Sequence, residues 1–343
     1  MWAMIVKEFR QVRRDHRTLA MMIVMPVVLL VVFGYAASFD TSEIPSIVIG
    51  PQAETAADRL PPIVDVVDVR PTADRDDAVE LLREGEAVVA LLAEGGAPTA
   101  LIDGSQLFVA RAAVQTFTAA GVPQEVLFNP TLDTSVVLVP GLAGLILLFI
   151  GTVITSLGVV RERQAGTLEQ LAVMPLRPKD VFIGKVAPYF LVAAIDLVVV
   201  LVVGALVFDV PFNGSLGTLA LGSVLFLFVT LGVGVLISGV SENQGQAVQL
   251  ALMTLLPQVL LSGIIFPLES MATGVRWLGY ALPLTWFNQI ARGVMVRGAP
   301  LSSLAVPLAI LAVFGTVVFG LAVIRFQRDL AASHRPEAVE AVA

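Results

Sequence analysis

Few residues in this chain carry side chains suited to covalent or metal chemistry. The 343 residues include no cysteine and only two histidines, His16 and His334, which both lie in charged terminal segments. The sequence therefore excludes a disulfide scaffold, a thiolate nucleophile and a zinc–sulfur site. It also lacks a G-x-x-x-x-G-K-[ST] phosphate loop, because Gly184 and Lys185 have neither the upstream glycine nor the following hydroxyl. We expect no catalytic, cofactor or metal site in this chain.

The most informative polar segment is 161–185, RERQAGTLEQLAVMPLRPKDVFIGK, which directly follows a long apolar run. It combines charges of both signs with Gly166, Pro175 and Pro178. A loop that only orients a membrane helix would need the basic residues but not the acids or the paired prolines. The pattern therefore favours a short helix beside the membrane that offers a firm docking surface to a soluble partner.

Asp196 is the one acid well inside an apolar run. An intramembrane carboxylate is costly, and it usually faces a cavity or a partner. A proton-coupled carrier would use such a group, so a secondary transporter is an alternative function.

Aromatic residues gather in segment 269–300, which contains Trp277, Tyr280, Trp286 and Phe287 beside three arginines. Such residues prefer the interface between membrane and water. The segment is either an ordinary interfacial hairpin or a set of short re-entrant helices that form an outer gate.

These groups must be positioned by a membrane-embedded fold. Hydrophobic residues make up 57% of the chain and charged residues only 14%, against about 25% charged in soluble domains. A run of about 17–25 apolar residues is long enough to cross the hydrocarbon core. Six runs qualify and predict an all-α six-span transmembrane bundle: 19–37, 134–160, 186–208, 216–240, 247–268 and 301–324.

Residues 38–133 form a more polar insertion with 16 acidic and five basic residues. This excess of negative charge argues against nucleic-acid binding, because phosphates are negatively charged. Short β-branched or apolar runs alternate there with helical spacing. We predict a small α/β domain in the order β-β-α-β-β-α, inserted between the first span and a five-span domain over 134–343. The strands are expected at 46–50, 64–69, 87–92 and 99–103, and the helices at 74–84 and 107–120.

Basic residues near the spans predict the orientation, because they favour the cytoplasmic side. Clusters in 7–17, 161–185 and 325–343 share one side if the spans alternate. Both termini, with the C-terminal tail 325–343, are then cytoplasmic and residues 38–133 extracytoplasmic. Residues 1–18 have the spacing of an amphipathic helix that lies in the interface against membrane lipid. The alternative is a cytoplasmic extension of the first span whose basic residues only set the orientation.

Segment 161–175 resembles the first cytoplasmic coupling segment of the permease subunits of type-2 ABC exporters. That pattern is R-E-[RK]-x-x-G-T-x-E-x-L followed by a proline, and the matching residues are Arg161, Glu162, Arg163, Gly166, Thr167, Glu169, Leu171 and Pro175. Segment 241–247 is similar to the second cytoplasmic turn, with Glu242, Asn243 and Gln244 as coupling candidates. Segments 261–267 and 283–298 resemble the C-terminal signature, although Ala272 stands where that signature usually has proline. In the coupling segment, Met174 stands where the family often has serine or threonine before the proline.

The resemblance implies an exporter permease of a drug- or lipid-efflux-like branch with a large extracytoplasmic domain, in the plasma (inner) membrane. Two separate ATPase subunits would bind ATP and Mg, a second permease would complete a homodimer or heterodimer, and the cargo would be a small amphipathic molecule. The implied exit-gate candidates are Phe266, Pro267, Trp277, Tyr280, Trp286 and Phe287. A membrane-anchored sensor or scaffold, with the outer domain as receptor, is a further alternative.

Overall fold

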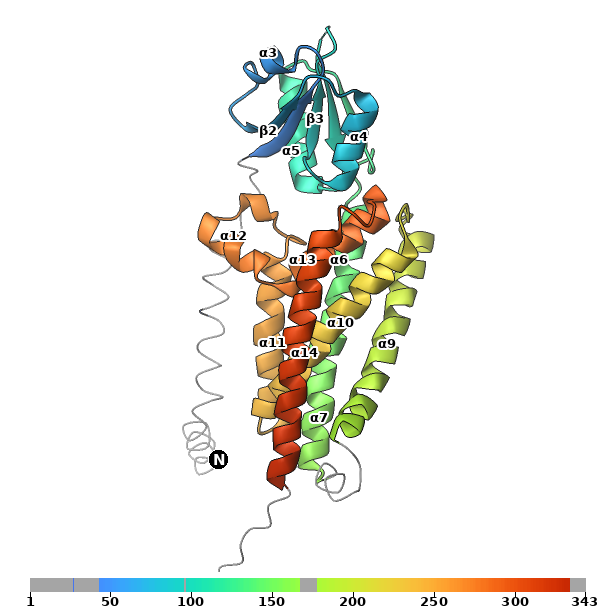
Figure 1. Cartoon of the computed structure of the whole chain (residues 1–343), viewed down its shortest axis with the longest axis vertical. Coiled ribbons are helices and arrows are strands. Elements are labelled where there is room, and N and C mark those ends of the chain that lie inside the picture. The colour runs from blue at the N-terminus through green and yellow to red at the C-terminus, as the bar shows by residue number, and fades with distance from the viewer. Residues whose placement is uncertain (1–26, 28–42, 96, 167–177, 334–343) are drawn as a thin grey trace, which may run out of the picture.

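A computed structural model of the chain describes residues 27, 43–95, 97–166 and 178–333. Figure 1 shows two parts, a small α/β domain at one end and a bundle of long helices below it. The predicted interfacial helix over 1–18 and the first predicted span over 19–37 lie outside the described residues. So do most of the predicted docking helix, over 167–177, and the last residues of the tail, 334–343.

The α/β domain contains a five-stranded sheet in the order β2-β1-β3-β4-β5. All neighbouring strands are parallel except β3 and β4, which are antiparallel. The predicted strands and helices are confirmed to within a few residues, but a short helix α3 and an edge strand β5 were not predicted. The elements are β1 Ile44–Ile49, α3 Ala53–Ala57, β2 Val64–Arg70, α4 Arg75–Glu84, β3 Val89–Leu92, β4 Thr99–Asp103, α5 Leu107–Ala119 and β5 Gln124–Leu127.

Helices cover both faces of this sheet because successive strand residues point to opposite sides. Val48 packs on one face with the fully buried Phe117 of α5. Ile47 packs on the other face with Leu82 of α4.

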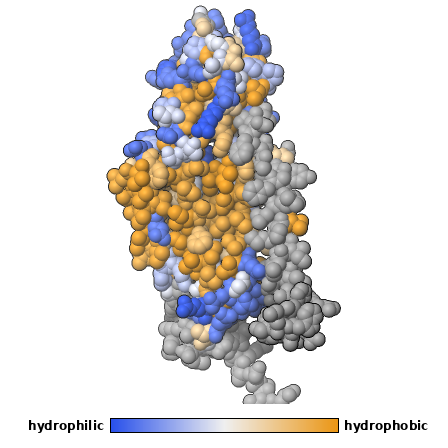
Figure 2. Space-filling view, turned by 180° about the vertical axis from the view of Figure 1, so that it is seen from behind, coloured by the Kyte–Doolittle hydropathy of each residue, from blue (hydrophilic) through white to orange (hydrophobic). Residues whose placement is uncertain are grey.

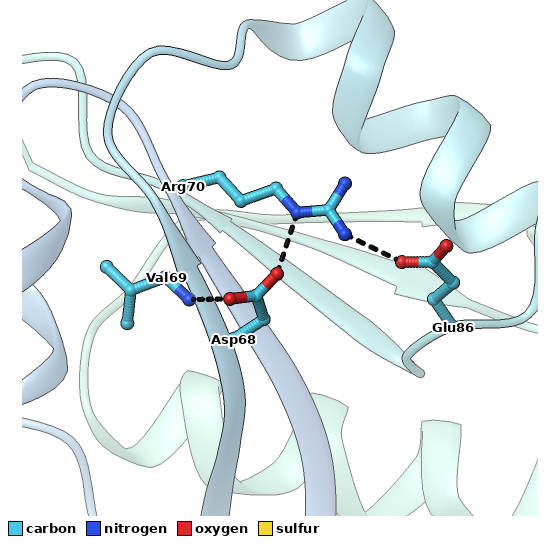
Figure 3. A network of polar contacts seen from close by, with 4 residues as sticks. All are labelled: Asp68, Val69, Arg70 and Glu86. Atoms are coloured by element: carbon cyan, nitrogen blue, oxygen red, sulfur yellow. Dashed lines mark hydrogen bonds and ion pairs between the residues drawn. The ribbon is translucent and has the colours of Figure 1, made fainter.

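A surface network joins strand β2 to the connection between α4 and β3 (Figure 3). Arg70 Nε lies 2.8 Å from Asp68 Oδ2, and its Nη2 lies 2.9 Å from Glu86 Oε2. The side chains are well exposed, and such pairs contribute at most about 1 kcal/mol. The network helps to hold the edge strand.

The helical part begins with one continuous rod. Helix α6 (Thr134–Phe149) passes through a π-helical turn η1 (Ile150–Ile154) into α7 (Thr155–Gln164). The later elements are α9 Pro178–Val207, α10 Leu216–Val240, α11 Gln244–Leu261, η2 Leu268–Ser270, α12 Thr273–Tyr280, α13 Pro283–Arg292, η3 Gly293–Arg297 and α14 Ala305–Ser333.

Four helical stretches among the described residues are long and apolar enough to cross a membrane: 134–164, 186–207, 216–240 and 305–325. Figure 2 shows a broad hydrophobic surface over the described helices, with hydrophilic residues on the α/β domain and at the opposite end of the bundle. The chain is therefore a membrane protein with a mostly helical membrane part.

The fifth predicted span, 247–268, differs from the structure. Helix α11 begins at Gln244 but ends at Leu261, and the following Gly263 has a φ of +81°. A left-handed residue favours glycine and stops an α-helix. Helix α11 is thus shorter than predicted, and it is not among the four long apolar helices.

Glycines at every seventh position of the α6–α7 rod allow neighbouring helices to approach closely. A Cβ at Gly144 would fall 2.7 Å from Phe287 of α13. A Cβ at Gly151 would overlap Thr230 of α10, and one at Gly158 would overlap the hydroxyl of Tyr189 on α9. All three glycines therefore serve packing within this chain.

Candidate functional site

The two segments predicted to couple to a partner meet at the end of the bundle that lies away from the α/β domain (Figure 1). Helix α7 ends at Gln164, and Gly166 has a φ of +71°, which lets the chain turn away. The meeting point involves Arg163, Gln164, Ser238, Ser241 and Gln244, and we name it the α7–α10–α11 junction.

Arg163 connects α7 to the last turn of α10. Its Nη1 donates hydrogen bonds to the carbonyl oxygens of Ser238, at 2.8 Å, and Ser241, at 3.2 Å. The last carbonyls of a helix have no partner within the helix and form its negative end. A guanidinium is therefore well suited to this position, because it supplies both donors and positive charge.

A second cation reaches the same helix end. Arg325 of α14 donates from Nη2 to the Gly239 carbonyl at 3.3 Å. The Ser241 hydroxyl donates to the Ile237 carbonyl at 2.7 Å. The end of α10 is thus held by side chains from two other helices and by its own cap.

The start of α11 is shaped by its own polar side chains. Asn243 is the N-cap, and its Oδ1 accepts from the Gln246 backbone N–H at 2.9 Å. The Gln246 side chain accepts in turn from the Glu242 backbone N–H at 2.9 Å. Gln244 then reaches across to α7, donating from Nε2 to Gln164 Oε1 at 3.0 Å. The two predicted coupling segments therefore touch directly.

An open cavity of about 730 Å³ lies at this junction. Arg163, Ser241, Glu242 and Arg325 line it together with Gln246. Around it Arg161, Gln164 and Gln244 are exposed, whereas Glu162 is half-buried. The arrangement is an accessible polar surface with a rigid base, which suits docking of another molecule.

The structure extends the predicted set of coupling residues and leaves part of it undescribed. Thr167, Glu169, Leu171 and Pro175 lie outside the described residues. Ser238 belongs to the junction, and Gln246 and Arg325 line the cavity beside it. None of these three was predicted as a site residue. Arg325 was recognised only as a basic residue beside a span, since nothing in its local sequence indicates which helix end it contacts.

The predicted exit-gate residues occupy different environments at the end near the α/β domain. Trp277 is 71% exposed, whereas Phe266 and Pro267 are buried. Trp286 donates from Nε1 to the Tyr280 carbonyl at 2.8 Å, and the two rings lie 5.9 Å apart. Phe287 is fully buried and stacks on Phe226 of α10 at 4.7 Å, so it belongs to the core of the bundle.

Asp196 lies on α9, a helix that exposes most of its apolar side chains, including Leu191, Ile195 and Leu206. The Asp196 side chain is half-buried, and it forms no ion pair with any residue that the structure describes. It does not belong to the α7–α10–α11 junction.

Comparison with known proteins identifies the family. Residues 16–324 match the family described as ABC-2 family transporter protein. The probable multidrug ABC transporter permease YbhS of Escherichia coli (strain K12) is 28% identical over 96% of this chain and 97% of its own length. The related permease YbhR of the same strain is 35% identical over 51% of this chain and 47% of its own length. The inner membrane transport permease YhhJ, also of that strain, is 30% identical over 65% of this chain and 60% of its own length.

These matches agree with the motifs that were read from the sequence, and the YbhS match spans almost the whole of both proteins. Permeases of this kind form the membrane subunits of ABC transporters and lack an ATPase site of their own. The chain belongs to the ABC-2 family of transporter proteins and is a permease of that family.

Proposed function

We propose that this permease exports an amphipathic or lipophilic molecule when two separate ATPase subunits act on the α7–α10–α11 junction. The observation that carries the proposal is the bridge from Arg163 to the α10 carbonyls. Because this bridge ties both coupling segments into one rigid unit, a push on either segment moves α7, α10 and α11 together. In this proposal the ATPase subunits, and not the permease, bind ATP and Mg.

The proposed topology has six spans in the inner membrane, with both termini in the cytoplasm and the α/β domain outside. Residues 19–37 and helix α11 supply the two spans beyond the four long apolar helices. Two observations support the orientation. The α/β domain and the junction lie at opposite ends of the bundle (Figure 1), and the described basic residues Arg163 and Arg325 lie at the junction end.

The proposed substrate is drug-like or lipid-like, and a second permease, identical or homologous, completes the pathway. The names of YbhS and YbhR, both described as multidrug permeases, support this class of cargo. The exposed apolar side chains of α9 would contact lipid. A lipophilic molecule would enter the transport pathway from this lipid.

The coupling role is tested by removing two acids of segment 161–175, Glu162→Ala with Glu169→Ala, in membranes that contain the permease and its ATPase. We expect the ATPase to co-purify less and to lose its stimulation by the permease. A matched control removes two exposed acids of the α/β domain, Glu54→Ala with Asp58→Ala. Unchanged co-purification and stimulation in the first variant would refute the coupling role.

The topology is tested by cysteine labelling, which is direct because the chain has no cysteine of its own. Ala165→Cys and Glu54→Cys place one thiol at an exposed position at each end of the molecule. A membrane-impermeant maleimide should label the Glu54→Cys variant in intact spheroplasts and the Ala165→Cys variant only after permeabilisation. The opposite result would place the junction outside and overturn the proposal.

A further inference from the structure

The long rod of α6 and α7 changes its helical geometry near its middle. At the end of the π-helical turn η1, the Thr155 N–H donates to the carbonyl oxygen of Ile150, five residues earlier, whereas an α-helix joins residues four apart. η1 is the only stretch of non-α geometry between Thr134 and Gln164, all of which the structure describes. Single π-helical turns inside α-helices frequently occur at functional sites, and helices kink at them.

Hydroxyl side chains bond to the backbone around this turn. The Thr155 hydroxyl donates to the Ile150 carbonyl at 3.2 Å, so this oxygen accepts from both the side chain and the backbone of Thr155. The Ser156 hydroxyl donates to the Val153 carbonyl at 2.9 Å. Hydrogen bonds of this kind compete with the regular helical ones and often bend a helix. Side chains therefore help to set the geometry of η1.

Thr152, in the middle of the turn, has no such bond. Its side chain is fully buried, and its Oγ1 has no hydrogen-bond partner among the described residues. A buried hydroxyl without a partner is unfavourable and therefore uncommon. In a bent helix a threonine hydroxyl donates to the carbonyl four residues earlier, which for Thr152 is that of Leu148. A bend at η1 would thus supply the partner that this hydroxyl lacks.

Small residues bring the backbones of η1 and α10 into contact. A Cβ at Gly234 of α10 would overlap the Gly151 carbonyl oxygen, and one at Gly151 would overlap Thr230. Glycines allow such close approach, and small sliding movements of packed helices are a common form of conformational change. A change of angle at η1 therefore moves no large side chain at this contact.

The two halves of the rod have different attachments. Helix α7 ends at the α7–α10–α11 junction, where Arg163 and Gln164 bond to α10 and α11. Helix α6 begins at the α/β domain, and its Gly144 packs against Phe287 of α13. Along the rod, movement at the junction reaches α6 only through η1.

We propose that η1 is a hinge with two states, each held by one threonine hydroxyl. In the state described here, Thr155 holds the Ile150 carbonyl. In the second state the rod bends, and the Thr152 hydroxyl donates to the Leu148 carbonyl. The inference rests on the proposed function, because the push of the ATPase subunits on the junction drives the change, and the bend tilts α6. Thr152 and Thr155 are positioning residues, since they act through the direction of the rod.

The first test compares stability with function. Thr152→Val removes a hydroxyl that the described state does not use, so it should not lower the melting temperature of the isolated permease, whereas Thr155→Val should lower it. In membranes with permease and ATPase, Thr152→Val should reduce the stimulation of ATP hydrolysis about fivefold, the change in population expected when the second state loses one hydrogen bond. Thr152→Ser keeps the hydroxyl and should restore stimulation to within about twofold of the parent protein.

Two controls separate the hinge from other effects. Thr316→Val removes an exposed hydroxyl that donates to the Ala312 carbonyl of its own helix α14 at 2.7 Å. Pro140→Ala removes the proline inside α6, which is the other candidate bending point of the rod. Both variants should leave stimulation unchanged. Co-purification of the ATPase should be normal in every hinge variant, whereas Glu162→Ala with Glu169→Ala, which tests the proposed function, should reduce it.

The second test measures the bend itself. Thr131→Cys with Ala165→Cys places spin labels at exposed positions beside the two ends of the rod, in a chain that has no other cysteine. The 31 residues of the rod are about 46 Å long, and a bend of about 30° at η1 would shorten the distance between the labels by about 2 Å. We expect this shortening in the parent complex trapped with ATP and vanadate, and its absence in Thr152→Val.

Three results would overturn the hinge: unchanged stimulation in Thr152→Val, a lower melting temperature in that variant, or an unchanged label distance in the trapped parent complex. Loss of stimulation in Pro140→Ala, with normal stimulation in Thr152→Val, would place the bend in α6 instead. A parent permease that neither binds nor stimulates the ATPase would overturn the proposed function, and the hinge with it.

Discussion

Replacing Arg163 by alanine should loosen the end of α10 by a measurable amount. The side chain donates two hydrogen bonds, at 2.8 and 3.2 Å, to carbonyls that have no helical partner. A hydrogen bond from a charged donor contributes about 1.5–3 kcal/mol. Because Arg163 is only half-buried, we assign about 2 kcal/mol to both bonds and the helix-dipole contribution together.

That free energy corresponds to about a 30-fold change in the local opening equilibrium. Amide hydrogen exchange over residues 238–246 of the isolated permease should therefore speed up about 30-fold in Arg163→Ala. Arg163→Lys keeps the charge but loses the planar fork, so we expect about a fivefold increase. The stability control is Arg161→Ala, since Arg161 is exposed and forms no hydrogen bond with the described residues.

The reasoning would be refuted if exchange in Arg163→Ala matched the parent protein, or if Arg161→Ala gave the same increase. If exchange does speed up, we also expect an effect on the complex with the ATPase. Arg163→Ala should reduce the stimulation of ATP hydrolysis by the permease, because the variant alters the α7–α10–α11 junction, while the rate of the ATPase alone is unchanged.

Three further predictions concern other parts of the chain. Burial raises the pKa of Asp103 above 3.8, so the folded chain binds more protons than the unfolded chain near that pH. The stability of the fold should therefore fall as pH rises from about 4 through the raised pKa. Thermal melts of Asp103→Asn at several pH values should lack this dependence. Gly151→Leu should cost about 2 kcal/mol or more in denaturant titrations because its side chain would overlap Thr230, whereas Gly320→Leu, in open space, should cost little. Asp196→Asn should leave ATP-driven dye efflux and its pH dependence within about twofold of the parent protein, and a loss of efflux with an altered pH profile would favour a proton-coupled carrier.

The α/β domain was largely predictable because its strands and helices have clear periodicity. Strand β4 begins at Thr99 and ends at Asp103, as its apolar run between polar breaks indicates. Strand β5 was missed because its four residues, including Gln124 and Glu125, show no apolar pattern. Its place in the sheet comes from parallel pairing with β4, which is a non-local contact.

The ends of the membrane helices were less predictable than their centres. Hydropathy does not reveal that Gly263 is left-handed, so the apolar run 247–268 continues past the true end of α11 at Leu261. The same limit applies to the junction. The family pattern indicates that Arg163 matters, but its acceptors at Ser238 and Ser241 lie more than 70 residues away in the chain. Only the packing of α7 against α10 brings them together.

The α/β domain is attached to the bundle at two places that belong to different helices. At the start of α6, Asn129 Nδ2 donates to the Asp133 carbonyl at 3.0 Å, and Arg111 donates to the Leu132 carbonyl at 3.1 Å. At η3, Arg297 forms an ion pair with Asp103 and packs against Gly85 at the end of α4.

These attachments differ in strength. The contacts at α6 are hydrogen bonds close to the peptide chain that joins domain and helix, whereas at η3 a 3.7 Å ion pair is accompanied by packing of Arg297 against Gly85. If ATP-driven motion at the α7 end tilts the continuous rod 134–164, the domain moves with α6. Separation of the domain from η3 would then stretch the Asp103–Arg297 contact. A cavity lined by Gly85, Arg297 and Trp286 lies beside this contact, so separation of the domain from η3 would widen this cavity.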